Sequence, residues 1–141
     1  MRYVLDASAA LCWVLSRPNA GKVVRLHADY RAAVHELIAP SMFPGEVASA
    51  LTKAERQKLI SVGDASRLVG RIMRTLPVMH SYEPLLARAV DVSSRFRSGL
   101  YDCLYVALAE REGCELVTDD QKLIKNLKPQ FPFIVPLASL P

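Results

Sequence analysis

The sequence has few cysteines and no long apolar segment, and each shortage excludes a class of protein. Among 141 residues there are three cysteines, and Cys12, Cys103 and Cys114 form no C-x-x-C pair. That pattern argues against a disulfide framework or a zinc ribbon and suits a reducing cytosol. No apolar run reaches the roughly 18 residues of a membrane helix, and Asp6 interrupts the one N-terminal run that resembles a signal peptide. We therefore expect a cytoplasmic protein.

Histidine is also scarce, with three residues in the chain. His27, His35 and His80 have no metal-ligand spacing with the acids or cysteines, so a histidine-based metal site is not expected. A hydrophobic content of 51% and a charged content of 23% are typical of a globular chain, not of a disordered one. The net charge of +4 favours an anionic partner such as nucleic acid or an acidic protein. The length suits one domain over residues 1–141.

Short apolar segments alternate with amphipathic ones along the whole chain, without internal repeats or low-complexity segments. The pattern predicts strands at 2–5, 37–39, 78–80, 115–118 and 133–137. It predicts helices at 8–15, 20–35, 44–57, 64–76, 83–96, 100–112 and 121–127. This alternation predicts an α/β sandwich, with a mostly parallel central sheet flanked by helices.

Acidic residues stand where these predicted elements begin or end. Asp6 ends the first strand, and Asp119 and Asp120 follow the strand at 115–118. Glu46 and Asp102 lie in the first turns of two helices. Because the carboxyl ends of parallel strands meet at one edge of a sheet, where ligands bind, these acids could converge there. Asp119 is the acid we expect to cap the helix that starts at 121.

Carboxylates crowded into one pocket repel each other, so the pocket must take up protons or bind cations. Oxygen ligands without histidine or cysteine suit Mg²⁺ or Mn²⁺, and such ions activate water for attack at phosphorus. The sequence therefore predicts metal-dependent hydrolysis of phosphodiester bonds. Because the acids alone would repel a polyanion, basic residues are needed to hold it, and the candidates are Arg17, Lys53, Arg56, Arg95, Arg97 and Lys122.

Simpler interpretations compete with this hypothesis. Asp102 could be stabilised by free backbone N–H groups and the helix dipole, and most of the basic residues are expected to be solvated surface charges. Trp13 and Tyr105 lie in apolar helical rows and are expected to pack in the core. A phosphatase of the HAD type needs a second acid where this chain has Ser8, so it is disfavoured. A non-catalytic acidic pocket, in a receiver-like domain or a degenerate nuclease, is the stronger alternative.

Four segments of the chain carry a family resemblance. They are YVLDASAAL at 3–11, PGEVASAL at 44–51, YDCLYVALAE at 101–110 and ELVTDDQKL at 115–123. In this order and spacing the chain resembles the PIN-domain nucleases, particularly the VapC-type toxins of prokaryotic toxin–antitoxin (VapBC) pairs. The resemblance implies a single PIN-like domain over residues 1–141 and an endoribonuclease that depends on Mg²⁺ or Mn²⁺.

The resemblance also implies roles for the acids. Asp6 and Asp102 match the principal metal ligands, while Glu46 and Asp120 match acids that bind a second ion or position the attacking water. The family usually places its last acid two residues after the threonine, which selects Asp120 over its neighbour Asp119.

Smaller residues and partners follow from the same resemblance. Ser8 and Thr118 match small polar positions that line the pocket, whereas Ser49 stands where the family usually has asparagine. VapC-type proteins are homodimers that a VapB-like antitoxin holds inactive, and tRNA and rRNA are common substrates. The resemblance does not choose between these RNAs.

Overall fold

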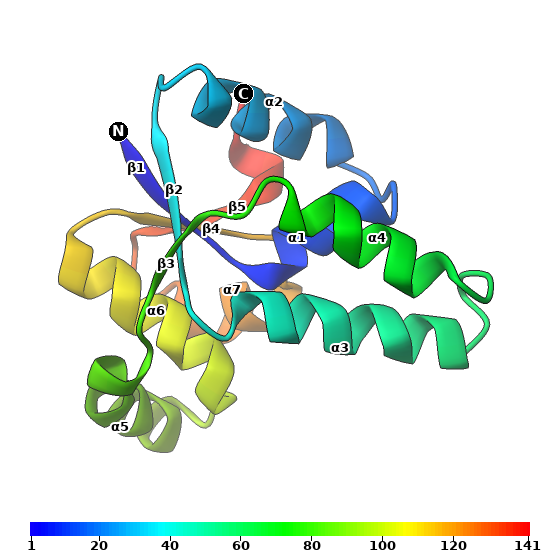
Figure 1. The fold of residues 1–141 in the computed structure, drawn as a ribbon. Helices are drawn as coiled ribbons and strands as arrows, with labels where there is room; N and C mark the ends of the chain where they lie inside the picture. The colour runs from blue at the N-terminus through cyan, green and yellow to red at the C-terminus, as the bar shows by residue number, and fades with distance from the viewer.

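Five strands form one parallel sheet in the computed structural model, which describes all 141 residues (Figure 1). The sheet order is β3-β2-β1-β4-β5, and every neighbouring pair is parallel. The strands are β1 (Arg2–Leu5), β2 (Glu36–Pro40), β3 (Val78–His80), β4 (Glu115–Thr118) and β5 (Ile134–Pro136). The predicted α/β fold with a parallel central sheet is confirmed.

Seven α-helices surround this sheet. They are α1 (Ala7–Val14), α2 (Ala20–Arg31), α3 (Phe43–Arg56), α4 (Asp64–Met73), α5 (Leu86–Phe96), α6 (Leu100–Glu112) and α7 (Gln121–Leu127). Helices α1 to α4 gather on one side, and α3 and α4 form an antiparallel hairpin that extends beyond the sheet (Figure 1). Helices α5 and α6 lie together on the other side, where α6 packs against β1, β2 and β4. None of the helices has the length and apolar character needed to cross a membrane.

Burial in the core explains why the sequences of the central strands are short apolar runs. Val4 and Leu5 of β1 and Leu116 and Val117 of β4 have no solvent-exposed surface, as expected for parallel strands that are covered on both faces. Helix α6 is buried on all sides over residues 103–109, which is why its sequence is apolar all round. This buried helix fixes the position of the acid in its first turn.

Helix α2 differs from its predicted range of 20–35, because it ends at Arg31. Ala33 has a φ of 58°, and the amide of Val34 donates to the carbonyl of Asp29, which closes the helix. The chain must reverse here to enter β2 at Glu36, and helical periodicity carries no signal for that reversal. The other predicted boundaries agree with the structure to within about three residues.

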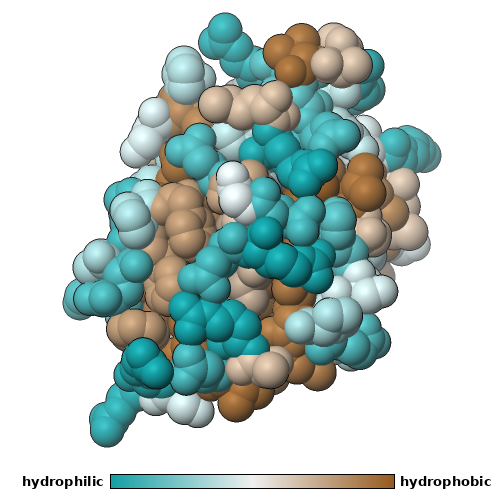
Figure 2. Space-filling view, turned by 90° about the vertical axis from the view of Figure 1, so that its left-hand side faces the viewer, coloured by the Kyte–Doolittle hydropathy of each residue, from teal (hydrophilic) through white to brown (hydrophobic).

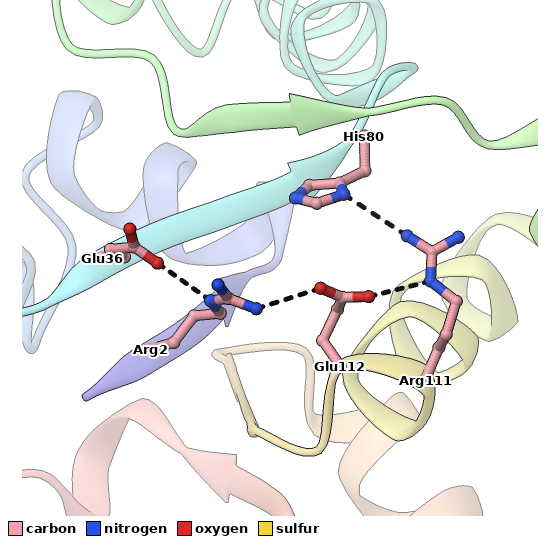
Figure 3. A network of polar contacts seen from close by, with 5 residues as sticks. All are labelled: Arg2, Glu36, His80, Arg111 and Glu112. Carbon is pink, nitrogen blue, oxygen red and sulfur yellow. Dashed lines mark hydrogen bonds and ion pairs between the residues drawn. The ribbon is translucent and has the colours of Figure 1, made fainter.

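A network of paired charges runs from the starts of β1 and β2 to the last residue of β3. Arg2 forms ion pairs of 2.9 Å with Glu36 and 3.0 Å with Glu112. Arg111 binds Glu112 at 3.0 Å and approaches Nδ1 of His80 at 3.3 Å, which completes the network in Figure 3. Figure 2 shows the side of the molecule where β1 begins, and hydrophilic residues cross its middle between separate hydrophobic patches. The acids of this network all have basic partners, so it ties the strands to α6 without excess negative charge.

Candidate active site

The strand order changes direction between β1 and β4. From β1 the chain crosses to β2 on one side, whereas β4 lies on the other side and leads to β5. In open parallel sheets the ligand crevice lies at such a switch point, beyond the carboxyl ends of the strands. Asp6 follows β1 there, and its amide donates to the carbonyl of Val117 at 3.0 Å. Asp119 and Asp120 follow β4 at the same edge.

Asp6 is the most deeply buried of the predicted site acids, with 3% of its surface exposed. Its Oδ2 accepts hydrogen bonds from the hydroxyls of Ser8, at 2.6 Å, and Thr118, at 2.8 Å. Those hydroxyls in turn accept from the backbone amides of Asp119, at 2.8 Å, and Asp120, at 3.1 Å. Burial raises the pKa of Asp6, while the two hydroxyls oppose that rise. Ser8 and Thr118 thus connect a buried carboxyl group to the turn that follows β4.

Asp102 lies in the first turn of α6 and is partly buried. Burial, followed by the negative charges of Asp6, Asp120 and Glu46, raises its pKa from 3.8 to about 7, and Lys122 opposes this rise. None of these four acids forms an ion pair. The acids therefore interact mainly by mutual repulsion, in contrast to the neutralised network at the other edge.

Glu46 has a partner that the sequence interpretation missed. The carboxyl group, in the first turn of α3, accepts a 2.6 Å hydrogen bond at Oε1 from the hydroxyl of Tyr105. Burial and the charges of Asp6 and Asp120 raise the pKa of Glu46, and the tyrosine lowers it. Tyr105 is fully buried, as expected for a core residue, yet a buried hydroxyl needs a partner. Its place one helical turn after Asp102 was the signal available in the sequence.

The prediction that Asp119 caps the helix after β4 is wrong. Asp120, not Asp119, is the N-cap of α7, because its Oδ1 accepts from the amides of Lys122, at 3.0 Å, and Leu123, at 3.1 Å. Burial raises the pKa of Asp119, and Arg17 opposes that rise. The capping bonds alone account for an acid at position 120, independently of any role in catalysis.

The six basic candidates are spread unevenly around these acids. Lys122 and Arg17 act electrostatically on Asp102 and Asp119, respectively, and Lys53 lines a groove that also contains Glu46. Arg95 is paired with Asp91 at 3.4 Å. The remaining two are exposed and form no ion pair, and they are Arg56 and Arg97.

The donor chemistry of this edge fits a hard divalent cation. Every candidate ligand is a carboxylate, which suits Mg²⁺ or Mn²⁺. A cation would relieve the repulsion among the acids, which adds to burial in raising the pKa of Asp102. In the arrangement seen, no three acidic, histidine or cysteine side chains are close enough to hold one ion together. Coordination by three or more of the acids would therefore require some of their side chains to rotate.

Comparison with known proteins now identifies the class. The family model of the PIN domain matches residues 3–128, and the chain belongs to the PIN-domain family. Among curated proteins it is similar to "Ribonuclease VapC12" of Mycobacterium tuberculosis (strain ATCC 25618 / H37Rv), with 34% identity over 87% of this chain and 90% of the relative. It is also similar to "VapC ribonuclease Mb0985" of Mycobacterium bovis, with 29% identity over 94% of this chain and 96% of the relative. The resemblance to VapC-type PIN proteins seen in the sequence is confirmed.

Solved structures share the fold. The crystal structure of PAE2754 from Pyrobaculum aerophilum matches 99% of this chain and 94% of its own with a TM-score of 0.71 at 22% identity. VapBC2 from Rickettsia felis, solved with a DNA fragment from its promoter, matches 96% of this chain and 97% of its own with a TM-score of 0.62 at 14% identity. These likenesses show that the chain shares its fold with both structures over nearly its whole length.

Proposed function

We propose that this protein is a VapC-type endoribonuclease that hydrolyses RNA phosphodiester bonds with the help of Mg²⁺ or Mn²⁺. The observation that carries the proposal is the set of carboxyl groups without ion-pair partners at the switch point, where burial and then the negative charges of the neighbouring acids raise the pKa of Asp102 to about 7. Curated relatives that cover most of the chain are named VapC ribonucleases, which supports the same activity. A cation bound at these acids would activate water and neutralise charge at phosphorus.

Each residue of the site has a distinct role in this proposal. Asp6 and Asp102 are the principal metal ligands, and Glu46 and Asp120 bind a second ion or position the attacking water. The hydroxyls of Ser8 and Thr118 orient Asp6 through their hydrogen bonds of 2.6 and 2.8 Å. Hydrogen bonds to the ligand carboxylates support this arrangement, because residues behind metal ligands hold them in place and tune them.

The proposed biological role is that of the toxin in a type II pair. The protein would act in the cytoplasm as a homodimer and be neutralised by a VapB-like antitoxin. The fold neighbour VapBC2 from Rickettsia felis supports such a partner. Induced expression should arrest growth, and co-expression of the antitoxin from the neighbouring reading frame should relieve the arrest. Growth that is unaffected by expression of soluble protein would contradict the toxin role.

Cleavage of purified RNA tests the enzymatic part directly. With labelled total RNA, the protein should cleave in Mg²⁺ or Mn²⁺ and stop in EDTA, whereas chelation of zinc alone in excess Mg²⁺ should have no effect. Asp6→Asn or Asp102→Asn should abolish cleavage, because each removes charge from the metal site and leaves side-chain volume unchanged. Glu83→Gln is the matched control, since Glu83 is exposed and forms no ion pair.

Two results would contradict the proposal. Full activity of either asparagine variant would remove that residue from the site. RNA binding without turnover by the unaltered protein in either metal would identify the alternative, a catalytically inactive acidic-pocket module. Affinity for RNA should also fall steeply with salt if basic residues contact phosphates.

A further inference from the structure

A groove adjoins the acids along one side of α3. It has a volume of about 590 Å³ and shares Glu46 with the candidate site. Its lining residues are Ser41, Met42, Gly45, Glu46, Ser49, Ala50, Lys53 and Tyr101. Because one wall carries a proposed catalytic acid, whatever occupies the groove lies next to the reaction centre.

Successive turns of one helix face form this wall. Glu46, Ala50 and Lys53 are four and three residues apart, so they project from the same side of α3. Seven residues of α-helix span about 10 Å, which separates the acid at one end of the wall from the amine at the other. Lys53 is exposed and forms no ion pair, so its charge is available to an anion.

The groove also contains an aromatic side chain without a partner. Tyr101 is 54% exposed, forms no side-chain hydrogen bond and takes part in no aromatic pair. It precedes Asp102 directly in the first turn of α6. Nucleic-acid bases stack on exposed aromatic rings of this kind when basic side chains nearby hold the phosphates.

The combination favours a nucleotide over a peptide as the occupant. Apart from Tyr101, the apolar lining consists of Met42 and Ala50, which is too little to anchor the apolar face of a partner helix. A free amine, a serine hydroxyl and an exposed ring match the phosphate, sugar and base of RNA. The groove also contains Glu46, one of the acids at which a phosphodiester would be cleaved.

We propose that this groove binds the nucleotide adjoining the cleaved phosphate, with its base stacked on Tyr101 and the following phosphate held by Lys53. This inference rests on the proposed ribonuclease function and assigns it a substrate subsite. Base stacking is tolerant of sequence, because every base has an aromatic face. The subsite therefore contributes affinity and register along α3, and other residues must select the sequence that is cut.

Binding of a fluorescein-labelled 12-nucleotide RNA of mixed sequence tests the subsite. The full-length Asp6→Asn protein in Mg²⁺ is the background, so that cleavage does not consume the probe. Tyr101→Ala should weaken binding by about 5- to 150-fold, the range for loss of one stacked base, and Tyr101→Phe should retain the affinity. Lys53→Gln should weaken binding and reduce the slope of log K against log salt by about 0.7. Arg31→Gln, on the distant helix α2, is the control.

Three outcomes would overturn the subsite. The first is equal affinity of all variants, and the second is the absence of salt-dependent binding in the background protein. The third is a Tyr101→Ala variant that binds RNA with unaltered affinity but changes molecular mass in light scattering or no longer binds the antitoxin. The groove would then be a protein interface. If the unaltered protein cleaves RNA while the groove variants cleave and bind normally, only the subsite fails. If the unaltered protein cleaves no RNA in Mg²⁺ or Mn²⁺, the proposed function itself fails.

Discussion

Replacing Asp102 with asparagine should stabilise the metal-free protein at alkaline pH. Burial and three neighbouring acids raise the pKa of this carboxyl group from 3.8 to about 7. Between these values the folded protein keeps a proton that the unfolded chain has released, so the free energy of unfolding falls as pH rises. The contribution is complete below pH 3.8 and is lost as pH passes through 7. Asparagine, which carries no charge at any of these pH values, avoids the loss.

The magnitude follows from the size of the pKa change. A rise of about three pH units corresponds to about 4 kcal/mol at about 1.4 kcal/mol per unit. Because Asp102 is partly exposed, solvent screening makes this figure an upper bound, and about 2–4 kcal/mol is expected at pH 8. At pH 4 the asparagine variant and the unaltered protein should differ by less than about 1 kcal/mol, because the carboxyl group is then largely neutral when folded.

Urea denaturation in EDTA at pH 4 and pH 8 measures this difference. Glu83→Gln serves as the control, since it removes one exposed acid outside the cluster. Adding Mn²⁺ at pH 8 should then stabilise the unaltered protein and leave Asp102→Asn nearly unchanged, because a ligand stabilises only the state that binds it. Two results would refute this reasoning about Asp102. The asparagine variant could be less stable than the unaltered protein at pH 8, or its free energy of unfolding could differ from that of the unaltered protein by the same amount at pH 4 and pH 8.

Two further variants test contacts of the acids, and a third tests a buried histidine on helix α2. Tyr105→Phe, which removes only the hydroxyl that binds Glu46 at 2.6 Å, should weaken Mn²⁺ binding by about tenfold. Isothermal titration would reveal this, and unchanged affinity would make the tyrosine a packing residue alone. Thr118→Val keeps the side-chain shape but removes a donor to buried Asp6. Urea unfolding at pH 7 should show a loss of about 1.5–3 kcal/mol, and a loss below about 0.5 kcal/mol would contradict the hydrogen bond. His27 is buried without a hydrogen-bond partner, and burial lowers its pKa from 6.5 to about 4. The contribution of the neutral imidazole to stability is therefore complete above pH 6.5 and is lost as pH falls through 4. His27→Leu should therefore gain about 3 kcal/mol relative to the unaltered protein between pH 7 and pH 4, and parallel pH profiles of the two proteins would refute this.

Local patterns were sufficient for the elements of the fold. The strands at β1 and β4 are short apolar runs because parallel strands are buried on both faces, and such runs are visible without tertiary information. Helix α2 was predicted too long because a chain reversal at Ala33, with a φ of 58°, depends on where the next strand must begin.

The sequence indicated which residues could form the candidate site, but it did not indicate which contacts they make. Strand ends and helix starts indicated Asp6, Glu46, Asp102 and Asp120, since parallel topology gathers such positions at one edge. The sequence placed Tyr105 one helical turn after Asp102, but it did not indicate that the hydroxyl of Tyr105 would bind Glu46, because that hydrogen bond joins residues 59 positions apart.

The sequence was also unable to assign separate roles to Asp119 and Asp120, although they are adjacent. Both aspartates after β4 precede α7 closely enough to cap it. Only the path of the turn makes Asp120 the cap. The amide of Asp119 then binds Ser8, which is 111 positions away.

The sequence by itself determined the alternation of strands and helices and the chemical identity of the acids, because both depend on residue type and local spacing. Tertiary structure alone decided which acids are buried, which are held by hydrogen bonds and how strongly they repel one another. Those properties arise from distances between segments that the chain brings together only on folding. The same packing created the groove between Lys53 and Tyr101, whose residues are 48 positions apart in the sequence and share one lining in the folded protein.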